Sequence, residues 1–177
     1  MEEKEELYEL GYRDNVQALF RAKSSSRFLN GSAWHAAYIF EAMLQHAESS
    51  VDIFCRNLNE SVFSHTFIKR ALSNIGNNVK VNILVQSCSD DIEAKDLFDD
   101  IRGNNYPRVN VKAIVNTENK KLPYNFAVMD GRAFRFEPTR DTIAAIASAN
   151  EPETAQMLMS QFQSIQNKEP KVSKNEH

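Results

Sequence analysis

The fold is decided by residues 125–150, which read NFAVMDGRAFRFEPTRDTIAAIASAN. The apolar run at the start of this stretch ends at Asp130-Gly131, a dipeptide favoured in the two-residue turns that join antiparallel strands. A second apolar run follows the turn. A third, at residues 142–148, leads directly to Asn150, which can cap a helix. The stretch therefore predicts a hairpin, a further strand and the start of a helix.

Helical and strand-like patterns alternate along the chain before this stretch. Apolar residues recur every three or four positions in some segments and every second position in others. The expected elements are helices at about 32–48, 61–75 and 90–102 and strands at 51–56, 79–85 and 109–115. A last helix follows Asn150, with Pro152 in its first turn. This order predicts an α/β fold in which helices flank a mixed β-sheet.

The length of 177 residues suits one domain with a hydrophobic core. We divide the chain into an N-terminal helical extension (1–31), an α/β domain (32–167) and a flexible C-terminal tail (168–177). The helical spacing of the extension is interrupted near Gly11, and a serine-rich loop follows it. We expect the extension either to pack on the core or to dock a partner.

Composition and charge narrow the cellular setting. The net charge of −3 and the pI near 5.8 give no general attraction to nucleic acid or to anionic membranes. A protein with this net charge can still carry a local basic stripe on one face. No run approaches the ~18 apolar residues of a membrane helix, and the acidic start is unlike a signal peptide. Cys55 and Cys88 lie at the ends of apolar runs, and we interpret both as buried, reduced thiols. We therefore expect a cytoplasmic protein with no membrane partner.

Polar side chains follow the expected strands, and in open α/β sheets ligands bind beyond the carboxyl ends of strands. Arginine forks and amides suit phosphate recognition. The candidates for ligand binding are Arg56, Asn57, Asn59, Asn125, Asp130, Arg132, Arg135 and Arg140. A simpler interpretation remains open for the asparagines, which often cap helices or loops. In a regular strand, Arg132 and Arg135 would also point to opposite faces, with Arg135 in solvent.

Patterns typical of other chemistries are missing from the sequence. No cysteine pair has zinc spacing, and no glycine loop of the phosphate- or dinucleotide-binding type occurs. No serine lies in a Gly-x-Ser-x-Gly elbow. The histidines, among them His46 and His65, are better explained as partly exposed residues at the edge of the core than as metal ligands. We expect no cofactor and no metal.

Residues 123–130 and 147–153 resemble phospholipase D-like domains, whose motif is His-x-Lys-x4-Asp on a strand. Alignment of the apolar run puts Asp130 at the motif's aspartate, Asn125 at its lysine and Pro123 at its histidine. The stretch before the last helix and the upstream order of elements match as well, over about residues 33–166. Proline and asparagine can neither attack a phosphodiester nor supply a cation, so the motif is degenerate.

The resemblance implies a single phospholipase D-like half and no catalytic residues. It also implies a homodimer, because single-motif members of that family build one cleft from two halves. The first functional hypothesis is a non-catalytic binding or assembly module that recognises a phosphate-containing ligand, such as nucleic acid, or a protein partner. The alternative is a phosphodiesterase or nuclease with a rearranged site, to which His46 or His65 contributes. The missing nucleophile favours the first hypothesis over an enzyme.

Overall fold

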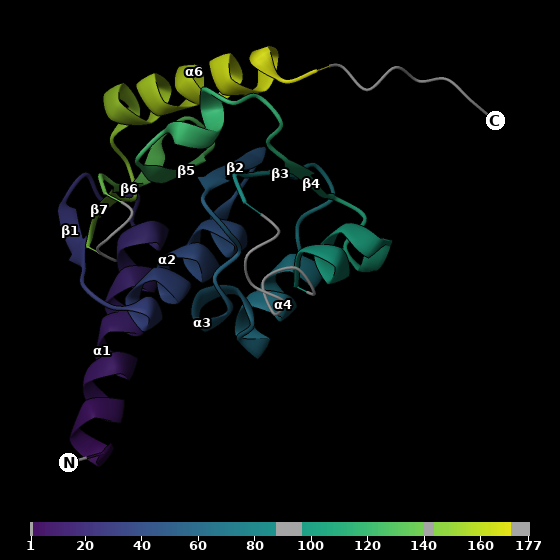
Figure 1. Ribbon diagram of the computed structural model, residues 1–177. Coiled ribbons are helices and arrows are strands. Elements are labelled where there is room, and N and C mark those ends of the chain that lie inside the picture. The colour runs from purple at the N-terminus through teal and green to yellow at the C-terminus, as the bar shows by residue number, and fades with distance from the viewer. Residues whose placement is uncertain (1, 88–96, 140–143, 171–177) are drawn as a thin grey trace.

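The computed structural model describes residues 2–87, 97–139 and 144–170 (Figure 1). The helices are α1 (Glu2–Arg21), α2 (Ala33–His46), α3 (Glu60–Phe63), α4 (Thr66–Ser73), the π-helix η1 (Ile101–Asn105), the 3-10 helix η2 (Asn119–Lys121) and α6 (Pro152–Lys168). The strands are β1 (Arg27–Asn30), β2 (Ser50–Cys55), β3 (Lys80–Val85), β4 (Val109–Ala113), β5 (Asn125–Met129), β6 (Ala133–Glu137) and β7 (Ala145–Ser148).

The seven strands form one sheet in the order β1-β7-β6-β5-β2-β3-β4. Strands β2, β3 and β4 run parallel, whereas β5, β6, β7 and β1 are each antiparallel to the strand beside them. The predicted class, a mixed sheet flanked by helices, is therefore confirmed.

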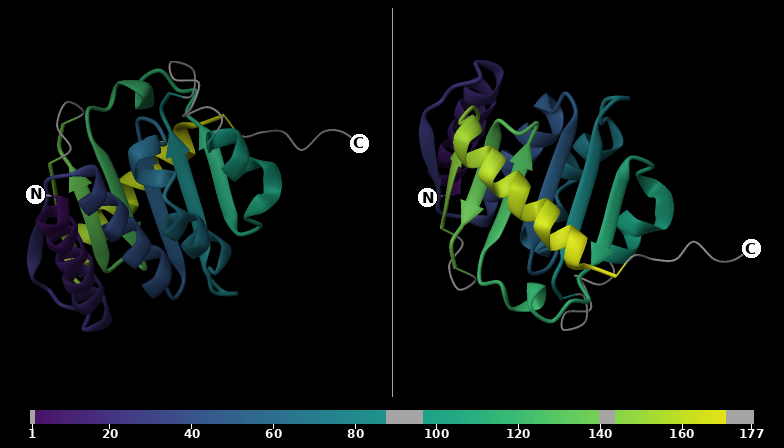
Figure 2. Two further views of the ribbon diagram at one scale, coloured as in Figure 1. Left: turned by 90° about the horizontal axis from the view of Figure 1, so that it is seen from below. Right: turned by 90° about the horizontal axis from the view of Figure 1, so that it is seen from above.

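Helices cover both faces of the sheet (Figure 2). Helices α1 to α4 lie on one face, over a core that contains Val81 and Ile83. Helix α6 crosses the other face diagonally, over a second core that contains Phe54 and Leu84. Alternate residues of β2 and β3 thus enter different cores, as the pleat of a strand requires. Helix α6 does not pass over the amino ends of β3 and β4.

The hairpin of β5 and β6 forms as predicted. Asp130 and Gly131 have φ angles of +53° and +62°, and two consecutive left-handed residues are what a type I′ turn requires. The turn closes with a 3.0 Å hydrogen bond from the Arg132 N–H to the Met129 carbonyl. Because Met129 pairs with Ala133, the turn leaves Arg132 outside the strand ladder.

Several element boundaries differ from the sequence-based expectations. The expected helix at 61–75 is two short helices, α3 and α4, and the last helix has Glu151 rather than Asn150 at its cap position. The expected helix at 90–102 and the expected strand at 142–148 each begin outside the described residues. Cys88 also lies outside the described residues. None of the described helices is both long and apolar enough to cross a membrane.

The N-terminal segment differs most from the expectation. Helix α1 is continuous through Gly11, so the expected interruption is wrong. Val16 and Phe20 are 0% and 1% exposed in the main core. After the helix, β1 pairs with β7 and extends the sheet. Residues 27–30 therefore form a strand that the sequence-based expectation did not include. The extension packs on the core, which is the first of its two expected roles.

Candidate ligand-binding site

The carboxyl ends of the parallel strands mark the candidate site. Strand β5 runs antiparallel to β2, and β6 antiparallel to β5, so Asn125 at the start of β5 lies opposite Glu137 at the end of β6. Arg56 follows directly after β2 at the same end of the sheet. We call the residues Arg56, Asn57, Asn125 and Glu137 the carboxyl-end site.

Asn125 connects three parts of this site. Its Oδ1 accepts a 2.9 Å hydrogen bond from the Arg56 backbone N–H, and its Nδ2 donates a 2.8 Å bond to Glu137 Oε1. Asn125 is the residue that the resemblance aligns with the lysine of the phospholipase D-like motif. Its amide therefore joins β2, β5 and β6, whereas a lysine would place a cation here.

Arg135 lies in the interior, next to this site. It is 3% exposed, and its guanidinium lies 5.5 Å from the centre of the Phe40 ring. Its Nη2 donates to Glu137 Oε2 at 2.9 Å, and its Nε donates to Asn30 Oδ1 at 2.8 Å. The expectation that a strand would leave Arg135 in solvent is wrong, because α1 and α2 cover that face of the sheet. Burial lowers the pKa of Arg135 and Glu137 opposes this, but a guanidinium stays charged at neutral pH.

Asp130 lies at the opposite end of β5 from Asn125, about 17 Å away at the usual rise of a strand. Its carboxylate accepts hydrogen bonds of 2.8–2.9 Å from the backbone N–H groups of Glu48, Ser49 and Ser50 and from the Ser49 hydroxyl. Burial alone would raise the pKa of Asp130, but these bonds together hold it below its usual value. The carboxylate thus fixes the loop that leads into β2.

Arg132 also lies at this opposite end. Its Nη1 donates to the Ala149 carbonyl at 2.7 Å and its Nη2 to the His46 carbonyl at 3.5 Å. The structure therefore does not bring Asp130 and Arg132 together with Arg56, Asn57 and Asn125. The predicted ligand residues fall at two ends of the sheet.

The remaining predicted residues have local roles or lie elsewhere. Asn59 caps α3, since its Oδ1 accepts from the Ser61 N–H at 2.9 Å, which is the helix-capping interpretation. Asn57 is half-buried beside the exposed Arg56. Arg140 lies outside the described residues. Among the residues that the structure describes, no group of three or more His, Cys, Asp or Glu side chains could hold a metal ion.

The two histidines proposed for a rearranged active site make contacts with residues outside the carboxyl-end site. His46 is hydrogen-bonded to Gln17 Oε1 at 2.9 Å, at the end of α2 that also contacts Arg132. His65 contacts the Ser61 carbonyl at 3.0 Å and stacks with Phe67, at a ring distance of 4.9 Å. The two imidazoles therefore contact residues of α1, α3 and α4, the helices on the face of the sheet opposite α6.

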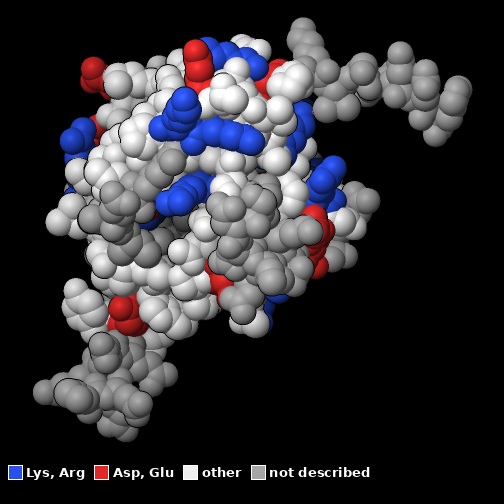
Figure 3. Space-filling model, viewed as in Figure 1, with Lys and Arg blue, Asp and Glu red and all other residues white. Residues whose placement is uncertain are grey.

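Two lysines that are not among the predicted ligand-binding residues, Lys120 and Lys121, lie at the same end of the sheet as the carboxyl-end site. Gln86, directly after β3, donates to the carbonyls of Asn119 and Leu122 at 2.7 and 3.0 Å and so holds η2 at this end of the sheet. Helix η2 carries the exposed Lys120 and Lys121. Figure 3 shows Lys and Arg side chains gathered over η2 and the strands beside it. The Lys-Lys pair is visible in the sequence, but the contact of Gln86 with the η2 carbonyls is not.

Solved structures with the same architecture define the class of fold. Nuc from Salmonella typhimurium, described as a phospholipase D family member, superimposes with a TM-score of 0.60 at 12% identity, over 82% of this chain and 96% of its own. NucT from Helicobacter pylori gives 0.58 at 16% identity, over 80% and 96%. The archaeal chromatin protein TrmBL2, whose structure is described as showing a novel mode of DNA binding, gives 0.55 at 14% identity. That match covers 96% of this chain and 61% of TrmBL2.

The fold is therefore phospholipase D-like, as the sequence resemblance predicted. Residues 32–170 match a family described as a domain of unknown function, DUF7931, and the chain belongs to that family. No curated protein sequence matches the chain.

Proposed function

We propose that this chain is a non-catalytic binding module of phospholipase D-like fold that recognises a phosphate-containing ligand, nucleic acid first, at the carboxyl-end site. The observation that carries the proposal is the bonding of Asn125. Both ends of its amide are engaged by Arg56 N–H and by Glu137, at the position aligned with the family's catalytic lysine. A site built in this way holds its shape without offering a cation for catalysis.

The charges around Asn125 support an anionic ligand. Arg56, Lys120 and Lys121 are exposed at this end, while Glu137 is 8% exposed and paired with the interior Arg135. A phosphate backbone would therefore meet cations at the surface and no exposed carboxylate from Glu137. The description of TrmBL2 as a DNA-binding protein concerns that protein, and it makes nucleic acid the first ligand to test.

The proposal includes a homodimer, in which two copies place their carboxyl-end sites together to form one longer cleft. This follows the single-motif members of the phospholipase D-like superfamily. Sedimentation velocity on the full chain tests it directly. A monomer at every concentration would remove the shared cleft from the proposal and leave a single basic site.

Fluorescence anisotropy with short single- and double-stranded DNA and RNA, across a salt series, tests the ligand. Binding should weaken steeply with salt, and Arg56→Ala or the pair Lys120→Ala and Lys121→Ala should reduce the salt slope by about 1 for each phosphate that the side chains no longer neutralise. Arg70→Ala, an exposed charge on α4, is the matched control and should leave binding unchanged. If the wild-type chain binds none of these probes at low salt, nucleic acid is excluded and a protein partner becomes the ligand to seek.

Turnover assays separate this module from a phosphodiesterase. We expect no hydrolysis of generic phosphodiester substrates, with or without divalent metal. Hydrolysis that disappears in His46→Ala or His65→Ala would overturn the non-catalytic proposal and support a rearranged active site.

A further inference from the structure

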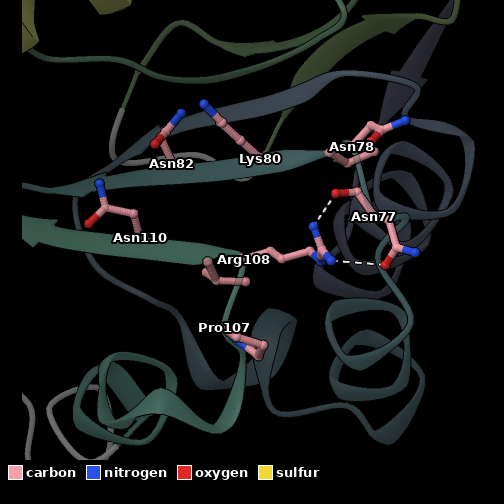
Figure 4. Close-up of a pocket in the computed structure, with 9 residues that line it drawn as sticks. Asn77, Asn78, Lys80, Asn82, Pro107, Arg108 and Asn110 are labelled. Carbon is pink, nitrogen blue, oxygen red and sulfur yellow. Dashed lines mark hydrogen bonds between the residues drawn. The ribbon is translucent and has the colours of Figure 1, made fainter.

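A second polar groove lies at the other end of the sheet. It has a volume of about 660 Å³ and opens at the amino ends of β3 and β4, where α6 does not cover the sheet (Figures 2 and 4). Its polar lining consists of Asn77, Asn78, Lys80, Asn82, Arg108 and Asn110. We call it the amino-end groove. None of the residues of the carboxyl-end site lines it.

Two of the asparagines stand side by side. Asn82 on β3 pairs in register with Asn110 on β4, and both point away from the face on which their neighbours Val81 and Val111 enter the main core. The Asn82 Nδ2 donates a 2.8 Å hydrogen bond to Asp52 Oδ1, which fixes the orientation of the amide. The amide's second N–H and its carbonyl oxygen stay available to a ligand, as does the exposed amide of Asn110.

Two cations complete the groove. Lys80 is exposed two residues before Asn82, on the same face of β3. Arg108 precedes β4, and its guanidinium donates to both the backbone carbonyl and, at 2.9 Å, the side-chain Oδ1 of Asn77. Figure 4 shows this double contact at one end of the groove, with Asn82 and Asn110 toward the other. The contact holds Arg108 in place beside the cavity.

The residue types that line the amino-end groove indicate which class of ligand it would bind. The described lining residues include two cations and four asparagines but no carboxylate and no aromatic ring. The nearby Asp52 is 9% exposed and is hydrogen-bonded to Asn82. Such a set offers N–H donors and positive charge, which suit phosphate oxygens, and nothing on which a base could stack. Its volume lies within the range of about 300–1,000 Å³ typical of small-ligand sites.

We propose that the amino-end groove binds a small phosphorylated ligand of about nucleotide size and holds it mainly by its phosphate. Lys80 supplies the charge, Asn110 and Asn82 donate to the phosphate oxygens, and Arg108 closes one end. This site is independent of the proposed carboxyl-end function, because the two sites share no residue and lie at opposite ends of the strands.

Isothermal titration calorimetry on the full chain tests the proposal, with inorganic phosphate, AMP, ATP and adenosine as probes. We expect phosphate, AMP or ATP to bind and adenosine not to bind. Lys80→Glu should abolish binding at the amino-end groove, and Asn110→Ala should weaken binding there about tenfold, the usual effect of losing a hydrogen bond to a charged group. Both residues are exposed, so thermal denaturation should show that both variants fold.

Arg56→Ala is the matched control, because it removes a cation from the opposite end of the sheet. It should leave phosphate binding at the amino-end groove unchanged, and Lys80→Glu should leave nucleic-acid binding at the carboxyl-end site unchanged. The proposal is overturned if wild-type protein binds none of the three phosphorylated probes. Equal binding of adenosine and AMP, or full binding by Lys80→Glu, would overturn it as well.

Discussion

Glu137 accepts a hydrogen bond of 2.8 Å from Asn125 on one carboxylate oxygen, and Arg135 donates to the other at 2.9 Å. Each oxygen of this buried carboxylate therefore has its own partner. Through Arg135 the chain of bonds continues to Asn30 on β1, and through Asn125 to the backbone of Arg56 after β2. One charged network thus ties the hairpin to two strands distant in sequence.

Loss of one partner of this buried pair should destabilise the fold strongly. Arg135→Ala leaves Glu137 buried without its counter-charge, so the free energy of unfolding should fall by about 3–5 kcal/mol. Urea denaturation measures this change. The double variant Arg135→Met with Glu137→Leu is the control, and it should lose far less because no buried charge is left unpaired. A single variant as stable as the wild type would show that the pair contributes little.

Asp130 should make stability depend on pH at the acid end. Because its folded pKa is lowered, its contribution is present above the unfolded pKa of about 3.9 and is lost as the pH falls through the folded value. Asp130→Ala should lower the free energy of unfolding by about 1–2 kcal/mol at neutral pH, the scale of lost hydrogen bonds to a partly exposed charge. Denaturation at neutral and at acid pH should show the difference from wild type shrinking. A difference that is constant with pH would contradict the role of the ionised carboxylate.

His46 should destabilise the fold in mildly acidic solution. Burial, together with the positive charges of Arg21 and Arg132, lowers the pKa of His46. The folded state therefore favours the neutral imidazole, so the contribution of His46 is full above the unfolded pKa of about 6.5 and declines as the pH falls below it. Thermal denaturation on both sides of that pH should show a larger loss for wild type than for His46→Gln. Parallel losses in the two proteins would exclude His46 as the cause.

The N-terminal helix should be needed for folding. Phe20 is 1% exposed, and Phe20→Ala should lower the free energy of unfolding by about 3–5 kcal/mol. Tyr8, 67% exposed on the same helix, is the matched control, and Tyr8→Ala should change stability by less than about 0.5 kcal/mol. Chemical denaturation measures both. If Phe20→Ala were also neutral, α1 would be a separable arm rather than part of the core.

Local signals explain which parts of the fold the sequence predicts. The β5–β6 hairpin follows from two apolar runs and an Asp-Gly turn, and α2 follows from Ser32, whose side chain accepts from the His35 N–H. Strand β1 has no such signal. It is four residues long, and it is a strand because it pairs with β7 near the other end of the chain. Pairing at that distance leaves no pattern in the strand's own residues.

The same limit applies to the candidate site. Strand alternation correctly separates Arg135 from Phe134, which enters the second core. It cannot say whether the face beneath Arg135 is open, because that depends on Phe40 of α2 and Asn30 of β1. Asp130 could be assigned to the turn, but its bonds to residues 48–50 arise only when β5 lies beside β2.

The pairing of β1 with β7 also sets an order of events during synthesis. Residues 27–30 leave the ribosome early, yet their partners, residues 145–148, are made only after β2 to β6. Until then, β6 is an open edge and Arg135 lacks Asn30 as a partner. Because long-range strand pairing forms slowly, a nascent chain exposes this edge for longer than its helices. Strand β7 covers the edge of β6 once it is made, and β1 then pairs with β7 as the outermost strand, so the pairing of β1 is a late step of folding.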